Sequence, residues 1–265
     1  MSKQTLWTTV AVTFAFASWP LAAMLSGGQI LSGLPIAREP HHHLVFQNEY
    51  VRVYEVEVGP HSATLEHQHE YDNLFVPFGD AHLANRVTGK LETHVDLADL
   101  AVNFSREPYS HVIRNEADQP FRNITIELLR PQGELREFYP SLDSALAAVP
   151  ERGRSVRQAT VLETQEMRLR AVSVGAGSAW SAPHDGRNHL LVQLDRIHNA
   201  GPREANSPFP AGMVVWISAD HDWNIYRAGR RDMKLMILDF EHSRGKNTSG
   251  DLQQVGRQNT SPEVQ

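Results

Sequence analysis

The chain has 265 residues, of which 41% are hydrophobic and 21% charged, a composition typical of a folded protein of one or two domains. The 25 Lys and Arg against 31 Asp and Glu give a formal charge of −6, and no basic stripe is present, which argues against DNA or RNA as a partner. The absence of cysteine excludes disulfides, thiolate metal sites and cysteine nucleophiles, so any metal must be held by histidine, carboxylate or amide groups.

Residues 1–26 are typical of a secretory signal peptide. A positive start at Lys3 precedes an uncharged apolar stretch over 6–17, and residues 15–17 offer a cleavage site with small residues. We therefore expect export to the periplasm or the cell exterior. The alternative is an uncleaved membrane anchor over 6–25, which is just long enough to span a bilayer and would also leave the rest of the chain outside.

An internal repeat organises the remainder of the chain. Residues 51–76 align without a gap with 167–192, an offset of 116 positions, and residues 110–128 align with 222–240, an offset of 112. The identity is low, but the pattern of apolar and turn residues agrees. Two similar units follow from this repeat.

The repeat sets the expected domain boundaries. Gly- and Pro-rich spacer sequence, a short helical pattern and a polar C-terminus separate or flank the two units. We expect a flexible linker over 27–40, an N-terminal unit over 41–140, a helical connector over 141–155, a C-terminal unit over 156–243 and a disordered tail over 244–265.

Short apolar or alternating segments rich in Val, Ile, Leu and aromatic residues predict strands, and Gly, Pro, Asn and Asp separate them at close spacing. This pattern indicates an all-β protein in which each unit folds as a β-barrel or double-sheet jelly roll. The segments are 51–58, 73–76, 121–129, 189–194, 214–217 and 234–240.

The first unit resembles the cupin family. The first cupin motif, a Gly, a His-x-His pair and a second Gly, is matched by Gly59, His67, His69 and Gly79. The second motif, a His followed four residues later by Asn, is matched by His111 and Asn115. The glutamate of the first motif is missing, and Arg106-Glu107-Pro108 replaces the Pro-x-Gly that usually precedes the second. With its two copies the chain is similar to a bicupin over residues 43–242, which implies two tandem cupin-type double-stranded β-helix domains.

The first motif also predicts a metal site. Because side chains alternate along a strand, His67, His69 and Tyr71 are expected on one inward face, and Asn73 shares it. With His111 from a neighbouring strand, three imidazoles would hold one divalent ion, and Fe, Mn, Ni, Cu and Zn all suit such ligands. Asn73 stands where the family has a glutamate ligand and would be a weak fourth ligand. Tyr71 is the candidate catalytic residue, as a hydrogen-bond donor to a bound substrate.

The histidine run at 41–43 lies directly before the first strand. We interpret it as a solvated strand entry, with loose metal binding as the alternative.

The second unit lacks the predicted ligands. Pro183, Asp185 and Trp223 stand where the first unit has its three histidines, so too few groups remain to hold a metal. We therefore expect a degenerate cupin domain with a structural role.

Two classes of function remain open. The family resemblance implies an exported metalloenzyme that acts on a small organic substrate, and a dioxygenase is favoured because the missing glutamate removes the obvious general base of an isomerase or lyase. The alternative is a non-catalytic periplasmic protein that binds a metal or small ligand. The expected partner is a small molecule. Contact with a membrane would come only through an uncleaved N-terminus, and the sequence is compatible with a homodimer.

Overall fold

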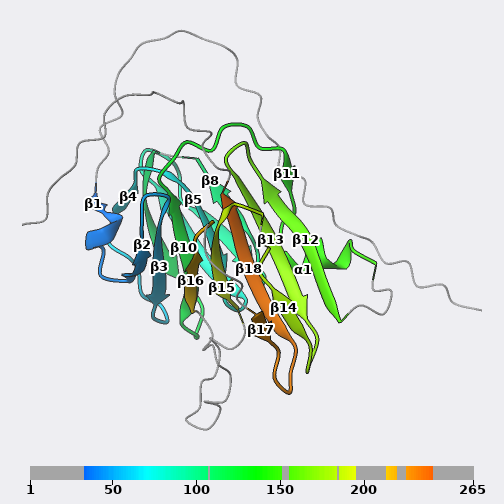
Figure 1. Cartoon of the computed structure of the whole chain (residues 1–265). Coiled ribbons are helices and arrows are strands. Elements are labelled where there is room, and N and C mark those ends of the chain that lie inside the picture. Colours follow the sequence, from blue (N-terminus) through cyan, green and yellow to red (C-terminus); the bar gives the residue numbers. More distant parts are fainter. Residues whose placement is uncertain are drawn as a thin grey trace, which may run out of the picture. The chain divides into compact units, whose positions relative to one another are not determined.

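Figure 1 shows a computed structural model of the chain. It describes residues 33–106, 108–150, 155–183, 185–194, 213–219 and 225–240. The predicted signal peptide or anchor and the predicted tail at 244–265 lie outside these ranges. Within them, no helix is long and apolar enough to cross a membrane.

The first unit consists of two five-stranded sheets, as the all-β prediction requires. One sheet has the order β1 (Leu34–Pro35), β4 (His67–His69), β9 (Tyr109–Asn115), β6 (Ala81–Val87) and β7 (Thr93–Leu97). The other has the order β2 (His42–Gln47), β3 (Val51–Val58), β10 (Phe121–Leu128), β5 (Asp72–Pro77) and β8 (Asn103–Ser105). Inward-facing side chains of both sheets line the interior of this barrel.

The second unit is built in a similar way from a six-stranded and a two-stranded sheet. The larger sheet has the order β11 (Glu137–Phe138), β12 (Val156–Glu163), β13 (Met167–Val174), β18 (Met233–Phe240), β15 (Asn188–Gln193) and β16 (Val214–Ile217). The smaller pairs β14 (Ala179–Ser181) with β17 (Ile225–Arg227). Because β11 pairs with β12, this sheet begins before the expected boundary at 140.

A single short helix, α1 (Leu142–Ala147), lies in the predicted connector within the described residues. Its first turn is fixed by a reciprocal pair of hydrogen bonds, in which Ser141 Oγ accepts from the Ser144 backbone N–H and Ser144 Oγ accepts from the Ser141 N–H. The cap satisfies backbone donors that the helix leaves without partners.

The strand register reproduces the sequence repeat. In the first unit Asn73 of β5 lies opposite Glu127 of β10, and at the offsets of the repeat His189 of β15 lies opposite Asp239 of β18. Since a slip of one residue would turn every side chain to the other face, the same positions face the same way in both units.

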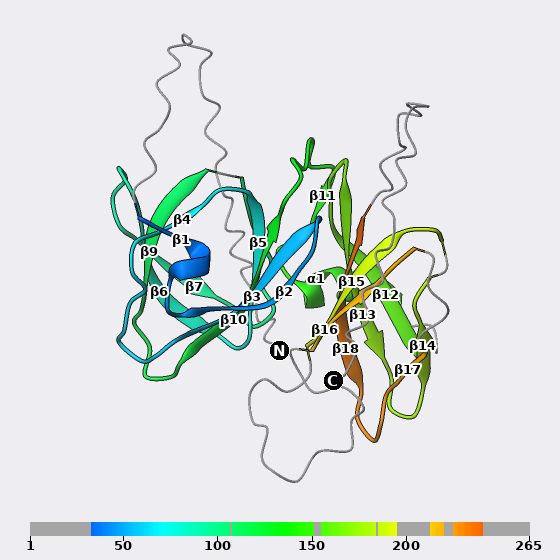
Figure 2. The same ribbon diagram turned by 60° about the vertical axis from the view of Figure 1, so that its left-hand side comes forward.

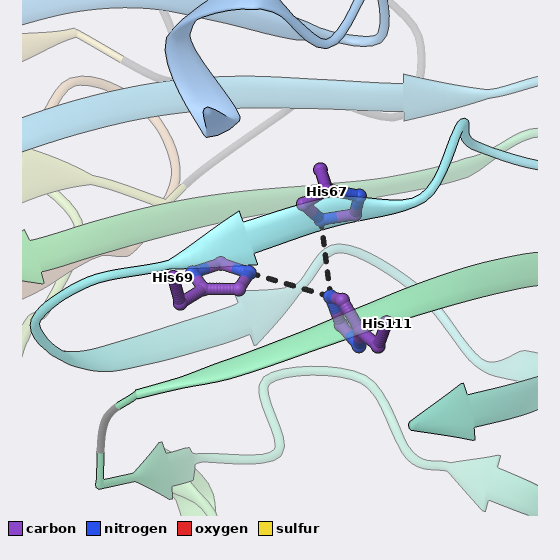
Figure 3. Close-up of side chains that lie close together, drawn as sticks. All are labelled: His67, His69 and His111. Carbon is purple, nitrogen blue, oxygen red and sulfur yellow. Dashed lines mark hydrogen bonds between the residues drawn. The ribbon is translucent and has the colours of Figure 1, made fainter. Parts of the chain in front are cut away.

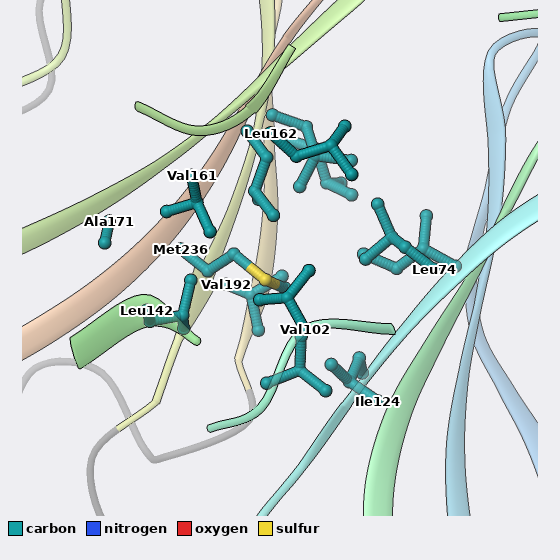
Figure 4. Packing of buried hydrophobic residues seen from close by; sticks show 14 of the residues in the cluster. Leu74, Val102, Ile124, Leu142, Val161, Leu162, Ala171, Val192 and Met236 are labelled. Atoms are coloured by element: carbon teal, nitrogen blue, oxygen red, sulfur yellow. The ribbon is translucent and has the colours of Figure 1, made fainter. Parts of the chain in front are cut away.

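One buried cluster of apolar side chains joins the two units (Figure 4). Leu74 and Ile124 come from the first unit, Leu142 from α1, and Val192 and Met236 from the second unit, and all are at most 1% exposed. Apolar faces of β5 and β10 on one side and of β15 and β18 on the other therefore form a shared core.

Residues 33–40, here called the strap, differ from the predicted flexible linker. They form β1 and the 3-10 helix η1 (Ile36–Arg38), and β1 pairs in parallel with β4 so that Leu34 lies opposite His67. Ile36 is 3% exposed, which anchors the strap in the core of the first unit. Gly33 has a φ of +108°, and a Cβ there would lie 2.8 Å from the carbonyl oxygen of Glu66, so the close approach requires glycine. Figure 2 shows η1 beside the sheet of β4 and β9.

Candidate metal centre

The three predicted histidine ligands meet inside the first unit (Figure 3). β4 supplies His67 and His69, and β9 supplies His111 directly opposite His67 in the ladder. The Nε2 atom of His111 lies 3.0 Å from that of His67 and 3.3 Å from that of His69. All three residues are at most 9% exposed. Among the described residues, this is the one group of three or more His, Asp or Glu side chains whose ligand atoms converge.

Hydrogen bonds on the far side of two rings fix their orientation. His67 Nδ1 donates to the carbonyl oxygen of Leu65 at 2.9 Å, and His111 Nδ1 donates to Asn85 Oδ1 at 3.1 Å. Each Nδ1 therefore carries the hydrogen, and each Nε2 directs a lone pair into the centre. The His69 ring is held by Tyr109, which stacks on it at 4.8 Å with an interplanar angle of 19°.

The electrostatics of the centre favour a cation. Burial lowers the pKa of His67 to about 4, helped by the nearby His42, and burial lowers the pKa of His69 and His111 well below the usual value. The three imidazoles are therefore neutral at pH 7 and have free lone pairs. Lone pairs 3.0 Å apart repel each other, and a divalent ion between them removes that repulsion. The nitrogen donors fit a metal of the Fe, Mn, Ni, Cu and Zn group.

Asn73 lines the cavity beside the histidines. Its Oδ1 accepts a hydrogen bond from the Tyr109 hydroxyl at 3.2 Å, and its Nδ2 donates to the carbonyl oxygen of Tyr71 at 3.2 Å. Burial raises the pKa of Tyr109 to about 12, so its hydroxyl remains a neutral donor. The Asn73 carboxamide is thus held by the protein on both sides.

Tyr71 does not share the inward face on which the sequence placed it. β4 ends at His69 and β5 begins at Asp72, so Tyr71 lies in the bend between two strands, where the alternation is interrupted. Its ring lies under the guanidinium of Arg52, 5.4 Å away, and it is not among the residues that line the cavity. Tyr109 of β9 takes the place beside the histidines.

The cavity beside the histidines contains about 440 Å³ of space between its lining side chains, part of it open to solvent. Its wall is mostly apolar, and among the described residues that line it none carries a carboxylate. Besides the three histidines, Asn73 and Tyr109, the lining residues are His42, Val56, Val58, Thr64, Phe75, Leu83, Ile113, Phe121, Asn123 and Thr125.

His42 was missed by the sequence analysis. The run at 41–43 is not simply a solvated strand entry, because the His42 side chain is 5% exposed and lines the cavity, with its ring 4.6 Å from that of His67. Glu39 of the strap, 2% exposed, accepts a hydrogen bond from His42 Nδ1 at 2.6 Å. Period-two alternation within β2 was the available signal, but the start of the strand was not recognised.

Glu127 is a second buried carboxyl group inside the first unit that the sequence analysis passed over. It is 1% exposed and lies 3.4 Å from Arg52 and 3.5 Å from the Tyr54 hydroxyl. Burial raises its pKa, and Arg52 opposes that shift only in part. Glu127 lies opposite Asn73 in the ladder of β10 and β5, and it is not among the residues that line the cavity.

In the second unit a different polar group occupies the equivalent interior positions. His189 Nδ1 lies 2.8 Å from Asp239 Oδ1, and Arg170 binds Asp239 through two hydrogen bonds of 2.6 and 2.7 Å. β14 ends at Ser181, just before Pro183, which has no N–H to donate to a ladder. Trp223, at the third ligand position, lies outside the described residues, so the predicted absence of a metal site stays a prediction.

Comparison with known proteins identifies the fold. No family model and no curated protein sequence matches the chain. An oxalate decarboxylase of Lactobacillus farciminis, solved with formate, has a TM-score of 0.51 and 10% identity over 73% of this chain and 77% of its own. The chain has a bicupin fold. A second oxalate decarboxylase structure gives a TM-score of 0.51 at 9% identity, covering 81% of this chain and 78% of its own. A cupin domain from Bordetella pertussis is 25% identical over 33% of this chain and 90% of its own, with a TM-score of 0.32.

Proposed function

We propose that this bicupin is a metal-dependent oxidoreductase of the dioxygenase type that acts on a small organic substrate. The observation that carries the proposal is the convergence of three neutral imidazoles on a largely apolar cavity. His67, His69 and His111 would hold one divalent ion, and such an ion, when bound, supplies Lewis-acid and oxygen chemistry at its open positions.

The charge of the site indicates how a substrate would bind. Three neutral ligands leave both positive charges of a divalent ion unbalanced by its ligands, and among the described residues none that lines the cavity carries a carboxylate. A substrate that binds through an anionic oxygen, such as a phenolate or an enolate, supplies the missing charge. Its organic body would contact apolar side chains such as Phe75, Leu83 and Ile113.

The described lining residues offer no carboxylate base for isomerisation or elimination, which favours oxidation. Proton transfer to and from carbon requires a base at the substrate; among the described residues that line the cavity none carries a carboxylate, Glu127 lies outside the lining, and His42 is the basic side chain there besides the three ligands. The Tyr109 hydroxyl donates its hydrogen to Asn73 Oδ1 and orients that carboxamide beside the centre. These groups would position a substrate against the apolar part of the cavity wall.

We also propose that the protein is exported, either as a mature protein after signal cleavage or on an anchor at 6–25. The apolar stretch behind Lys3 supports this proposal. To test this proposal, the protein is recovered from periplasm and from membranes, and mass spectrometry shows at which residue each form begins. Recovery of the intact chain from the cytoplasm alone would contradict it.

Oxygen uptake tests the proposed activity. Protein loaded separately with Fe, Mn, Ni or Cu is mixed with catechol, a 1,3-diketone, a flavonol or a thiol, and dissolved oxygen is followed. We expect consumption with at least one pair, abolished in the His67→Ala, His111→Ala double variant. If the metal-loaded protein consumes no oxygen with any pair but binds one of the compounds tightly, the protein is a non-catalytic binding protein.

A further inference from the structure

The strap brings a buried carboxylate close to the metal centre. Glu39 Oε2 accepts from His42 Nδ1 at 2.6 Å and from the His41 backbone N–H at 2.8 Å, and Oε1 lies 2.8 Å from His41 Nδ1 and 3.0 Å from the Leu65 backbone nitrogen. Burial acts to raise the pKa of Glu39, but hydrogen bonds from His42, His41 and Leu65 outweigh it and hold the pKa well below its usual value. Glu39 is therefore an anion that can only accept hydrogen bonds.

This anion fixes the tautomer of His42. Since both Glu39 oxygens are acceptors, Nδ1 of His42 carries a hydrogen, and in the neutral imidazole Nε2 then carries the lone pair. The His42 side chain lines the cavity, and its ring lies beside that of His67. It is not one of the three converging ligands, and among the described residues its ring hydrogen bond runs from Nδ1 to Glu39, which leaves Nε2 for a molecule in the cavity.

Three other acceptors in the lining each hold one donor. Asn73 Oδ1 accepts from Tyr109, Asn123 Oδ1 accepts from the Thr125 hydroxyl at 2.7 Å, and Thr64 Oγ1 accepts from the Ile113 backbone N–H at 3.0 Å. The His42 ring lies directly beside that of the ligand His67, so His42 is the acceptor nearest to a substrate hydroxyl that neighbours the metal-binding oxygen.

We propose that His42, oriented by Glu39, accepts a hydrogen bond from a substrate hydroxyl that neighbours the metal-binding oxygen. The inference rests on the proposed function and names its substrate class: small organic molecules that carry a free O–H on the atom next to the one whose oxygen binds the metal. His42 is then a specificity-determining residue, and Glu39 is the positioning residue that presents its lone pair.

A matched pair of phenols tests this contact. Zinc, which is redox-silent, is loaded into the full-length protein, and the binding of catechol and of 2-methoxyphenol is measured by calorimetry. Both can bind zinc through a phenolate, but only catechol keeps a neighbouring O–H. We expect wild type to prefer catechol about tenfold, the size of effect expected for one hydrogen bond.

Three substitutions separate the contact from the fold. His42→Asn keeps a donor where Nδ1 meets Glu39 but removes the group at Nε2, and we expect it to lose the preference. His42→Gln keeps a polar group near Nε2 and should retain part of it. His43→Asn is the control, because His43 is exposed on the same strand, and we expect the wild-type preference.

The outcomes distinguish this inference from the proposed function. If both phenols bind and His42→Asn keeps the full preference, the contact is wrong and the metal centre stands. If neither phenol binds zinc-loaded wild type, both the contact and a function on phenolic substrates are wrong.

Nitrogen-15 NMR of the imidazoles gives a readout that does not depend on substrate. We expect His42 to carry its hydrogen on Nδ1 in wild type, and Glu39→Gln to shift it toward Nε2, because a glutamine amide can donate to Nδ1. Glu39→Asp should restore the wild-type tautomer in part. A wild-type signal from the Nε2–H tautomer would overturn the inference.

Discussion

His67 Nε2 and His111 Nε2 lie 3.0 Å apart, although each ring donates its Nδ1–H to a fixed acceptor on the opposite side. Neither ring can rotate to separate the two lone pairs without losing its buried hydrogen bond. The site is thus arranged in advance for a cation, and its ordering is provided by Leu65 and Asn85 rather than by the metal.

Removing His67 and His111 should abolish stoichiometric metal binding. We expect wild type to retain about one equivalent of a divalent metal after dialysis, measured by elemental mass spectrometry, and the double alanine variant to retain none. At a free-metal concentration of about 100 times Kd, the metal should stabilise wild type by about 2.7 kcal/mol and the variant not at all. Equal metal content in both proteins would contradict the assigned ligands, and His43→Ala controls for loss of an exposed histidine.

Tyr109 and Tyr71 should differ sharply in their effect on turnover. Tyr109→Phe removes the hydroxyl that orients Asn73 and keeps the ring that stacks on His69, so we expect an active metal-loaded protein to lose about tenfold in oxygen-uptake rate. Tyr71→Phe changes a side chain outside the cavity lining and should leave the rate within about twofold. A larger loss for Tyr71→Phe would restore Tyr71 as the catalytic candidate.

The sequence predicted those site residues that alternation within one strand could locate. His67 and His69 lie two residues apart in β4, and the spacing of the second motif located His111 in the neighbouring strand. Tyr71 was misplaced because the alternation was extended through a bend that ends β4. Strand ends depend on which neighbour is available to pair, and that is set by the fold rather than by local sequence.

The Glu39–His42 pair could not be predicted for a related reason. The strap is short and contains Gly and Pro, which are typical of linkers, and its structure depends on Ile36 finding an apolar site and on pairing with β4. The repeat was more informative, since it correctly placed Asn73 with His189 and Glu127 with Asp239. A repeat compares positions within a common fold, and it is therefore insensitive to the ends of individual strands.

The shared core predicts that the two units unfold together. Leu190 of the second unit is fully buried in the cluster that also contains Leu74 of the first. Leu190→Ala should lower the free energy of unfolding by about 2 to 5 kcal/mol, while Leu91→Ala, at a side chain 91% exposed, should change it by at most about 0.5 kcal/mol. In a denaturant titration of Leu190→Ala, we expect the first unit to release its metal at the same denaturant concentration at which the tryptophan fluorescence changes. Two separate transitions would show that the units unfold independently.

Asp239 should stabilise the second unit in a pH-dependent way. Burial acts to raise its pKa, but hydrogen bonds from His189 and Arg170 outweigh burial and lower the pKa below its usual 3.8. A carboxyl group with a lowered folded-state pKa stabilises the fold above its unfolded-state pKa, and this contribution disappears as the pH falls through the folded-state value. Asp239→Asn should therefore lower the free energy of unfolding by about 3 to 5 kcal/mol at pH 7, because it leaves Arg170 without its buried partner. The difference from wild type should shrink below about pH 4.

Denaturant titrations of both proteins at pH 7 and at pH 3.5 measure this difference. Asp143→Asn is the matched control, since Asp143 pairs with Lys234 at a site where both side chains are more than one-third exposed, and its effect should be at most about 1 kcal/mol. A difference between wild type and Asp239→Asn that stays constant between the two pH values would mean that the Asp239 carboxyl group has the same pKa in the folded and unfolded states. An increase on acidification would contradict the sign of its pKa shift.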